Sequence, residues 1–265
     1  MKEKTKYRFP DLLEIMKKLR SPGGCPWDRE QDHISLKQYL IEETYEVLEA
    51  IDLEDRDRLA EELGDVLLQV VFHAQIAEEQ GEFDMDDVTD RICRKMLDRH
   101  PHVFGKGKAD TSEEVVSNWE AIKKRENGYQ SQTQVLQHVP SNLPALMRSC
   151  KVQKKAALVG FDWDQTEDVL ARVEEELREV KEVYQDGPED RIREELGDLL
   201  FAVVNLCRFL GQEPEITLTA ATEKFIRRFE YMEKNADRPL KDMNPGEMDS
   251  LWNQAKSALQ REMRV

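Results

Sequence analysis

The chain has 265 residues and a formal net charge of −16, with 39 Lys and Arg against 55 Asp and Glu. This acidity argues against a nucleic-acid backbone or an anionic membrane as the main partner, but it is compatible with a small phosphate ligand held by a metal ion. Only 12 Gly and 10 Pro accompany 39% hydrophobic and 35% charged residues, a balance typical of helix-rich proteins rather than disordered or β-rich ones.

Apolar residues recur at helical spacing along most of the chain, which predicts a series of amphipathic helices. No segment alternates convincingly at period two, so we expect an all-α fold without significant sheet. Gly81 and Gly211 are expected to end helices, and Asp-Gly-Pro at 186–188 to form a turn. In chain order, the predicted helices cover residues 10–20, 35–52, 56–80, 85–99, 112–126, 143–157, 166–185, 189–211, 214–235 and 246–262.

An acidic motif occurs twice, as EELGDVLLQVVF at 61–72 and as EELGDLLFAVVN at 194–205. The shift of 133 residues that superposes the two copies also superposes E-E-x-x-E at 42–46 on E-E-x-x-E at 175–179, and Trp119 on Trp252. Such matches predict a tandem duplication, with a unit too long for a solenoid repeat.

The duplication predicts two helical-bundle domains and a connection between them. The segment from 127 to 144 is polar, rich in Gln and Ser, and carries Pro140 and Pro144, as expected of a linker. We therefore predict an N-terminal domain at 1–128, a linker at 129–141 and a C-terminal domain at 142–265.

The N-terminus is charged, and no apolar run has the length of a signal peptide or a membrane span, so we expect a cytoplasmic protein without a membrane partner. Four widely spaced cysteines suit neither a zinc site nor a disulfide scaffold; they are Cys25, Cys93, Cys150 and Cys207.

Carboxylates gather on one side of two neighbouring predicted helices in each unit. Glu176 and Glu179 share a helix face, as do Glu195 and Asp198 on the next helix, and the turn at 186–188 makes these helices antiparallel. Converging carboxylates repel each other by several kcal/mol at ~4 Å and an intermediate dielectric. The alternative is that each E-x-x-E is only a solvated helix face. The recurrence of both pairs with the same 16-residue gap, from 46 to 62 and from 179 to 195, favours a shared metal site.

The chemistry of these groups indicates which metal they hold. No histidine follows residue 141, so the second cluster consists of carboxylates, which suit a hard cation such as Mg²⁺, with Mn²⁺ as a substitute. Gly197, inside the second EELGD, is expected to let a neighbouring helix approach.

These motifs resemble those of the all-α nucleoside triphosphate pyrophosphohydrolases, the MazG-like proteins. The tandem layout, CPWD at 25–28 and RHPHVF at 99–104 are similar to the two-domain bacterial members. The resemblance implies a Mg²⁺-dependent homodimer that hydrolyses the α–β bond of ribo- and deoxyribonucleoside triphosphates with broad base tolerance. It places the metal ligands at Glu176, Glu179, Glu195 and Asp198, with a second set at Glu43, Glu46, Glu62 and Asp65.

Further roles follow from position relative to these ligands. Glu175 is best placed to orient or deprotonate the attacking water. Arg172 and Arg191 each lie four residues before a predicted metal ligand, although ordinary helix-surface salt bridges would look the same. Trp252 either stacks on the base or ribose or packs in the core. The predicted nucleotide-binding set is Arg172, Glu175, Glu176, Arg191, Glu194, Lys224, Arg227, Arg228 and Trp252.

The two units are not equivalent. Pro101 is expected to end the helix that carries Arg99, whereas its counterpart with Lys224 and Arg228 continues, and Tyr39 stands where the second unit has Arg172. We therefore expect the C-terminal unit to be the main catalytic one. Two alternatives are a pyrophosphatase narrowly specific for one deoxynucleotide and a non-catalytic protein that senses nucleotides or binds a partner protein.

Overall fold

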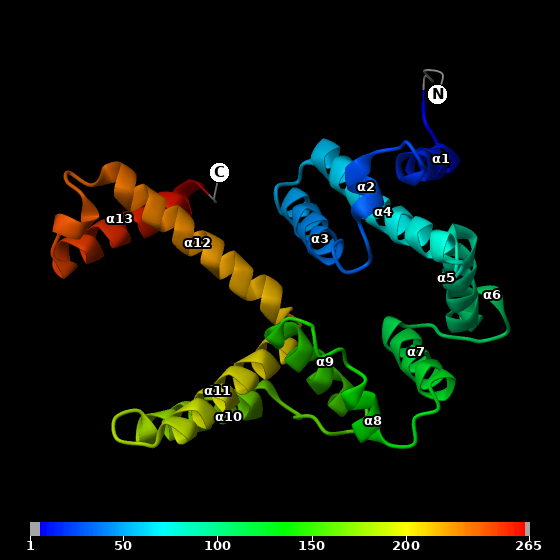
Figure 1. The fold of residues 1–265 in the computed structure, drawn as a ribbon. Helices are drawn as coiled ribbons and strands as arrows, with labels where there is room; N and C mark the ends of the chain where they lie inside the picture. The colour runs from blue at the N-terminus through cyan, green and yellow to red at the C-terminus, as the bar shows by residue number, and fades with distance from the viewer. Residues whose placement is uncertain (1–5, 263–265) are drawn as a thin grey trace. The chain divides into compact units, whose positions relative to one another are not determined.

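The computed structural model describes residues 6–262, apart from the side chains of residues 113, 121, 124 and 260–262. Within this range all regular structure is helical, in agreement with the predicted all-α fold (Figure 1). The chain divides into two compact units, one ending at Trp119 and the other starting at Glu120. No helix of the described range is both long and apolar enough to span a membrane.

Unit 1 is built on an antiparallel pair of helices, α3 and α4, that lie side by side in Figure 1. Its core consists of Met16, Leu36, Val71, Phe72 and Ile76, so α1 and α4 supply most of the buried apolar surface. The helices of this unit are α1 (Phe9–Arg20), α2 (Pro26–Glu30), α3 (Lys37–Asp52), α4 (Arg56–Gln80), α5 (Met85–Arg99), α6 (Pro101–Phe104) and the first half of α7 (Ser112–Glu126).

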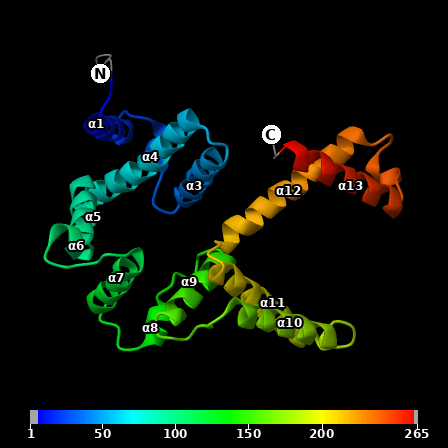
Figure 2. The ribbon, with the colours of Figure 1, turned by 180° about the vertical axis from the view of Figure 1, so that it is seen from behind.

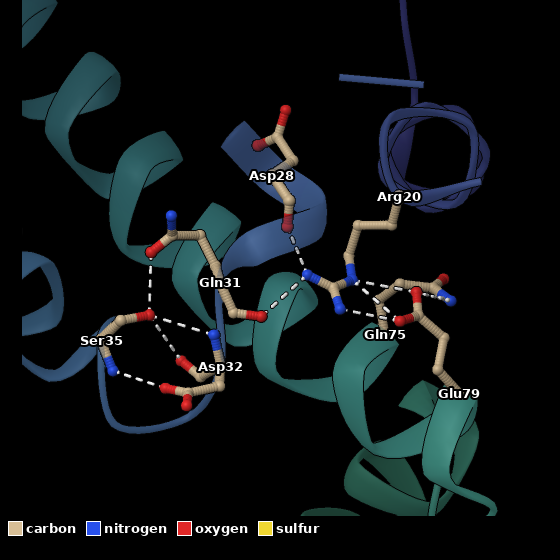
Figure 3. Close-up of polar contacts among 7 residues, drawn as sticks. All are labelled: Arg20, Asp28, Gln31, Asp32, Ser35, Gln75 and Glu79. Atoms are coloured by element: carbon tan, nitrogen blue, oxygen red, sulfur yellow. Dashed lines mark hydrogen bonds and ion pairs between the residues drawn. The ribbon is translucent and has the colours of Figure 1, made fainter. Parts of the chain in front are cut away.

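Arg20, at the end of α1, ties three segments of unit 1 together (Figure 3). Its guanidinium donates to Glu79 on α4 at 2.7 and 2.9 Å, to the Gln31 carbonyl at 3.1 Å, and to the Asp28 carbonyl. The Arg20 side chain is only 7% exposed, and hydrogen bonds that involve a charged group are among the stronger ones in proteins. This network fixes the loop before α3, and hence the start of the helix that carries the E-E-x-x-E motif at 42–46.

Unit 2 is built on a second antiparallel pair, α10 and α11, which also lie side by side in the view from behind (Figure 2). Cys150, Val169, Ala202 and Val204 are buried between α9, α10 and α11, while α13 packs on α12. The helices are α8 (Gln132–Gln137), α9 (Ala145–Ala157), α10 (Thr166–Val183), α11 (Glu189–Phe209), α12 (Pro214–Asn235), a 3₁₀ turn (Leu240–Asp242) and α13 (Pro245–Glu262).

All ten predicted helices are present, with ends within two residues of their expected positions. Gly81 and Gly211 follow their helices in the left-handed region, at φ 71° and 72°, which glycine adopts without a Cβ penalty. The short helices α2, α6 and α8 were not predicted. Helix α8 lies within the polar segment 129–141, and the two units divide within α7, where Glu120 pairs with Lys155 of α9 at 2.9 Å.

Candidate active site and metal centre

Three carboxylates from two helices converge in unit 2. Glu176 and Glu179 come from α10 and Glu195 comes from α11. Each contributes one carboxylate oxygen, and these three oxygens all lie within 4.8 Å of one another. Glu176 is 2% exposed and Glu195 5% exposed. The tight connection between the helices requires Gly187, because a Cβ there would lie 2.6 Å from the Val183 carbonyl oxygen.

Two arginines face this cluster, as their spacing predicted. Arg172 pairs with both Glu175 and Glu176, and Arg191 donates to Glu195 at 2.6 Å. The pKa of Glu179 is raised by burial, by its hydrogen bond with Glu195 and by the charges of the neighbouring carboxylates. Even with two guanidiniums nearby, the cluster therefore keeps an excess of negative charge.

Two observations indicate that the cluster can hold a hard cation: its ligands are all oxygen atoms, and one buried oxygen has no partner among the described residues. Glu176 Oε2 is buried and has no hydrogen-bond partner among the described residues, although buried polar atoms are normally satisfied. All three clustered ligands are oxygen donors, which Mg²⁺ and Mn²⁺ prefer. A cation between the three carboxylates would satisfy this atom and relieve their repulsion.

Unit 1 repeats the arrangement with a different subset of the predicted ligands. Here Glu43 of α3 clusters with Glu62 and Asp65 of α4, again with one oxygen of each within 4.8 Å of the others. Arg58 pairs with Glu62 at 3.3 Å and with Glu49. Arg58 corresponds to Arg191 under the 133-residue shift. It was not among the predicted site residues, although the repeat could have identified it.

Each cluster leaves out one predicted ligand, and the two omissions differ. Asp198 is exposed and lies outside the unit 2 cluster. Glu46 lies outside the unit 1 cluster, yet its pKa is raised by burial and then by the charge of Glu62 and a hydrogen bond to it. Each of the four positions of the repeated E-x-x-E and E-x-x-D pattern therefore belongs to a carboxylate cluster in at least one of the two units.

The remaining predicted nucleotide-binding residues of unit 2 lie on other surfaces. Lys224 and Arg227 are exposed on α12 and Glu194 is exposed on α11. Arg228 lies 5.6 Å from the centroid of the Trp252 ring. Phe225 also contacts Trp252, with ring centroids 5.1 Å apart, so Trp252 joins α13 to α12. The described contacts bring Arg172 and Arg191 to the carboxylates but do not bring the α12 and α13 residues to them.

Two expectations about local structure have different outcomes. Helix α5 ends at Arg99, two residues before Pro101, as predicted. The expectation for Gly197 is wrong, because a Cβ at this position would meet no atom within 4 Å among the described residues. Gly197 therefore does not admit a close neighbouring helix within this unit.

Replacing Glu43 with glutamine should raise the thermal-unfolding midpoint of the metal-free protein near neutral pH. Burial and then the charges of Asp65 and Glu46 raise the pKa of Glu43 above its ordinary value of 4.5. Because the folded state holds this proton more tightly, stability is lost as the pH rises from 4.5 through the raised pKa. The gain from Glu43→Gln should thus be full at about pH 8 and absent below the unfolded pKa of 4.5.

Calorimetry at these two pH values, with EDTA present, measures this difference. The control is Glu61→Gln, which removes an exposed acid of α4 outside the cluster. If Glu43→Gln raised the unfolding midpoint equally at both pH values, or did not raise it at pH 8, repulsion within the cluster would not destabilise the folded state.

Comparison with known proteins agrees with this geometry. The MazG nucleotide pyrophosphohydrolase domain matches twice, at residues 31–104 and 164–235, and each match includes one pair of acidic helices. A nucleoside triphosphate pyrophosphohydrolase/pyrophosphatase MazG of Thermotoga maritima is 47% identical over 94% of this chain and 95% of its own length. A nucleoside triphosphate pyrophosphohydrolase of Escherichia coli K12 is 47% identical over 92% and 95%.

A further relative, the uncharacterized protein YabN of Bacillus subtilis, is 49% identical over 96% of this chain but only 53% of its own length. The two domain matches span more than half of the chain, and the first two relatives align over nearly their whole length. The chain therefore belongs to the MazG nucleotide pyrophosphohydrolase family, in which it carries the domain twice.

Proposed function

We propose that this MazG-family enzyme is a Mg²⁺-dependent nucleoside triphosphate pyrophosphohydrolase that converts a triphosphate and water into a monophosphate and pyrophosphate. The observation that carries the proposal is the buried carboxylate cluster of unit 2, with its unsatisfied Glu176 oxygen and its two facing arginines. The names of the Thermotoga and Escherichia relatives support the same reaction.

In this proposal Glu176, Glu179 and Glu195 hold the cation, with Asp198 one helical turn further along α11. When bound, Mg²⁺ would neutralise phosphate oxygens and help to position the attacking water. Mn²⁺ is expected to substitute, since it accepts the same oxygen donors.

Glu175 is proposed as the general base. It lies beside the cluster but outside it, and Arg172 bridges it to Glu176. Its side chain is 46% exposed, so water reaches it. A carboxylate that is fixed in this way and not used by the metal can orient a water molecule and accept its proton.

The arginines are proposed to have a second role when the substrate is bound. Arg172 and Arg191 already stand at the carboxylates and would face the phosphates that arrive with the cation. The proposal also retains Glu194, Lys224, Arg227, Arg228 and Trp252 as nucleotide-binding residues. Glu194, Lys224 and Arg227 are exposed, and Arg228 and Trp252 are partly exposed, so a substrate or a second subunit has room to meet them.

A homodimer is also proposed. Large apolar side chains remain exposed on α10 and α11, among them Leu177, Leu196, Leu200 and Phe201. A symmetric pair of chains would bury such surface. Analytical ultracentrifugation that found only monomers at micromolar concentration would remove this part of the proposal.

Pyrophosphate release from all four ribo- and all four deoxyribonucleoside triphosphates, each with Mg²⁺, tests the function. Release from most of the eight is expected, because the cluster and its arginines address the phosphates and not the base. Release from a single triphosphate would instead identify a narrowly specific enzyme. No release from any would favour a protein that senses nucleotides without hydrolysing them.

A further inference from the structure

Two histidines of unit 1 face each other outside the carboxylate cluster. The Nδ1 atoms of His33, in the loop before α3, and of His73, on α4, lie 2.8 Å apart. The two rings are nearly parallel, at 12°, and their centroids lie 5.1 Å apart. Because the two nitrogens are much closer than the centroids, they lie between the rings and point at each other. This geometry is that of an N–H···N hydrogen bond from one imidazole to the other.

The hydrogen bond depends on how many protons the two rings carry. A neutral imidazole has one N–H donor and one acceptor nitrogen, whereas a protonated imidazole has donors only. The bond therefore forms when both rings are neutral or when only one of them is charged. If both are protonated, two N–H groups face each other and two positive charges repel. Double protonation thus breaks the bond between His33 and His73.

The surroundings of His73 oppose this second proton. Burial, and then the charge of His33, lowers the pKa of His73 below its ordinary value of 6.5. A ring that is released from the contact binds its proton near the ordinary value, so the open form binds more protons than the closed form. The closed form is therefore fully favoured above pH 6.5 and loses its advantage as the pH falls below that value.

Other carboxylates nearby do not reproduce this pH dependence. The pKa of Asp32, beside His33, is lowered chiefly by a hydrogen bond from the Ser35 backbone, so Asp32 stays charged until the pH falls below 3.8. The pKa values of Glu43 and Glu46 on α3 are raised, so acidification stabilises the fold through these two groups. Loosening of unit 1 between neutral and mildly acidic pH would thus have the opposite sign to their effect.

The remaining charged groups on the elements packed around the pair are held in other contacts, are exposed or lie further along α4. The charge of His33 is the one that shifts the pKa of the His73 ring. Lys17 and Arg20 of α1 pair with Glu78 and Glu79 of α4, Asp28 of α2 is partly exposed, Arg29 and Glu30 of α2, Lys37 of α3, and Asp86 and Asp87 of α5 are exposed, and Glu62 and Asp65 lie at least two helical turns before His73.

The histidine contact joins a compact loop to α4. The loop covers residues 31–36 and leads directly into α3. Within it, Asp32 accepts hydrogen bonds from the Ile34 and Ser35 amides at 2.8 and 2.7 Å, the second of which is drawn in Figure 3. No histidine follows residue 141, and the 133-residue shift places Leu206 at the position of His73. Unit 2 therefore has no equivalent pair.

We propose that the His33–His73 contact is a pH-sensitive switch in unit 1, which is closed at neutral pH and opens on acidification, releasing the loop from α4. Because this loop leads into α3, opening would loosen the start of the helix that carries Glu43 and Glu46. The corresponding helix of unit 2 would not respond. The inference goes beyond the proposed function and does not depend on it, since the contact involves neither metal nor nucleotide.

Hydrogen exchange of the full-length protein in EDTA, at about pH 7.5 and about pH 5.5, tests the switch. After correction for the intrinsic pH dependence of exchange, amides of residues 31–40 should exchange faster at the lower pH. The increase should reach up to about tenfold for each pH unit below 6.5, if one additional proton accompanies opening. The matching segment of unit 2, residues 164–173, should show no such increase. No increase in residues 31–40, or an equal increase in both segments, would overturn the proposal.

Two substitutions of His33 should hold the switch in opposite states. His33→Asn supplies a donor and an acceptor near the position of Nδ1 and does not titrate, so residues 31–40 should stay protected at both pH values. His33→Ala removes the contact, so these amides should exchange fast at both. The control, His138→Asn, changes an exposed histidine outside the pair and should keep the wild-type pH dependence. Wild-type pH dependence in His33→Asn, or full protection at neutral pH in His33→Ala, would refute the role of the pair.

Proton NMR of the histidine rings measures the switch in the unaltered protein, and so decides the question even if His33→Ala fails to fold. The Cε1 proton signal of His73, identified by its absence in His73→Gln, should titrate with a midpoint below the ordinary 6.5. In His33→Ala, if it folds, this midpoint should rise toward the ordinary value, because the opposing charge is gone. A His73 midpoint at or above 6.5 in the unaltered protein would contradict the proposal.

Discussion

Replacing Glu179 with glutamine should lower the rate of triphosphate hydrolysis by at least about a hundredfold, with little loss of stability. Glu179 shares the unit 2 cluster with two buried glutamates. Its pKa is raised by burial, then by its hydrogen bond with Glu195 and by the charges of both glutamates. Glutamine keeps the size of the side chain but removes one negative charge from the site. Ten- to a hundredfold losses are typical for residues that merely support metal ligands, so a change of a ligand itself should cost at least as much. Steady-state hydrolysis of a triphosphate at several Mg²⁺ concentrations measures the effect.

The matched control is Glu46→Gln, the identical change at the equivalent position of unit 1. It should reduce hydrolysis by less than about threefold if unit 2 performs most of the chemistry and Glu46 lies beside its own cluster rather than in it. A large loss from Glu46→Gln together with a small loss from Glu179→Gln would move the active site to unit 1.

Replacing Glu175 with glutamine should lower kcat by about 10²- to 10⁴-fold, the range for loss of a general base. Glu175 lies outside the carboxylate cluster and is held by Arg172. Its loss should therefore leave the Mg²⁺ concentration needed for half-maximal activity nearly unchanged, unlike the loss of a metal ligand. Hydrolysis rates across a Mg²⁺ titration separate the two effects.

Glu174→Gln serves as the control for this substitution, since it removes the neighbouring exposed carboxylate from the same helix. Near-normal turnover in Glu175→Gln would exclude the general-base role. A shift in Mg²⁺ dependence as large as the one in Glu179→Gln would make Glu175 a metal ligand instead.

Much of the fold could be predicted from the sequence because long amphipathic helices show a regular apolar spacing and end at glycine or proline residues. Gly81 and Gly211 end α4 and α11 in left-handed conformations that glycine favours. The short helices α2, α6 and α8 span four to six residues, too few to show a helical period. Their formation depends on local turns and tertiary contacts, which a pattern of apolar residues does not record.

The candidate site was predictable to the extent that it depends on spacing along a helix. The i, i+3 and i, i+4 pairs, the antiparallel turn and the 133-residue shift were enough to bring Glu176, Glu179 and Glu195 together. The same rules could not tell that Asp198 is exposed while Asp65 joins its cluster, because this depends on side-chain packing in each unit. They also gave no sign that Gln69 is buried with an amide oxygen that has no hydrogen-bond partner among the described residues.

The predicted phosphate-binding residues of α12 mark another limit of the sequence. Lys224 and Arg228 share a helix face, as expected from their spacing. Arg228 lies against Trp252 of α13, and among the described residues it forms no ion pair with a carboxylate. Spacing within one helix says nothing about which helix, or which subunit, the face meets.

Phosphorus NMR of ATP mixed with Mg²⁺ and the full-length protein tests the central claim most directly, because it identifies the bond that is broken. We expect AMP and pyrophosphate to appear together, no ADP to accumulate, and Glu179→Gln to suppress both products. ADP with inorganic phosphate as the first products, or AMP formation that persists undiminished in Glu179→Gln, would contradict it.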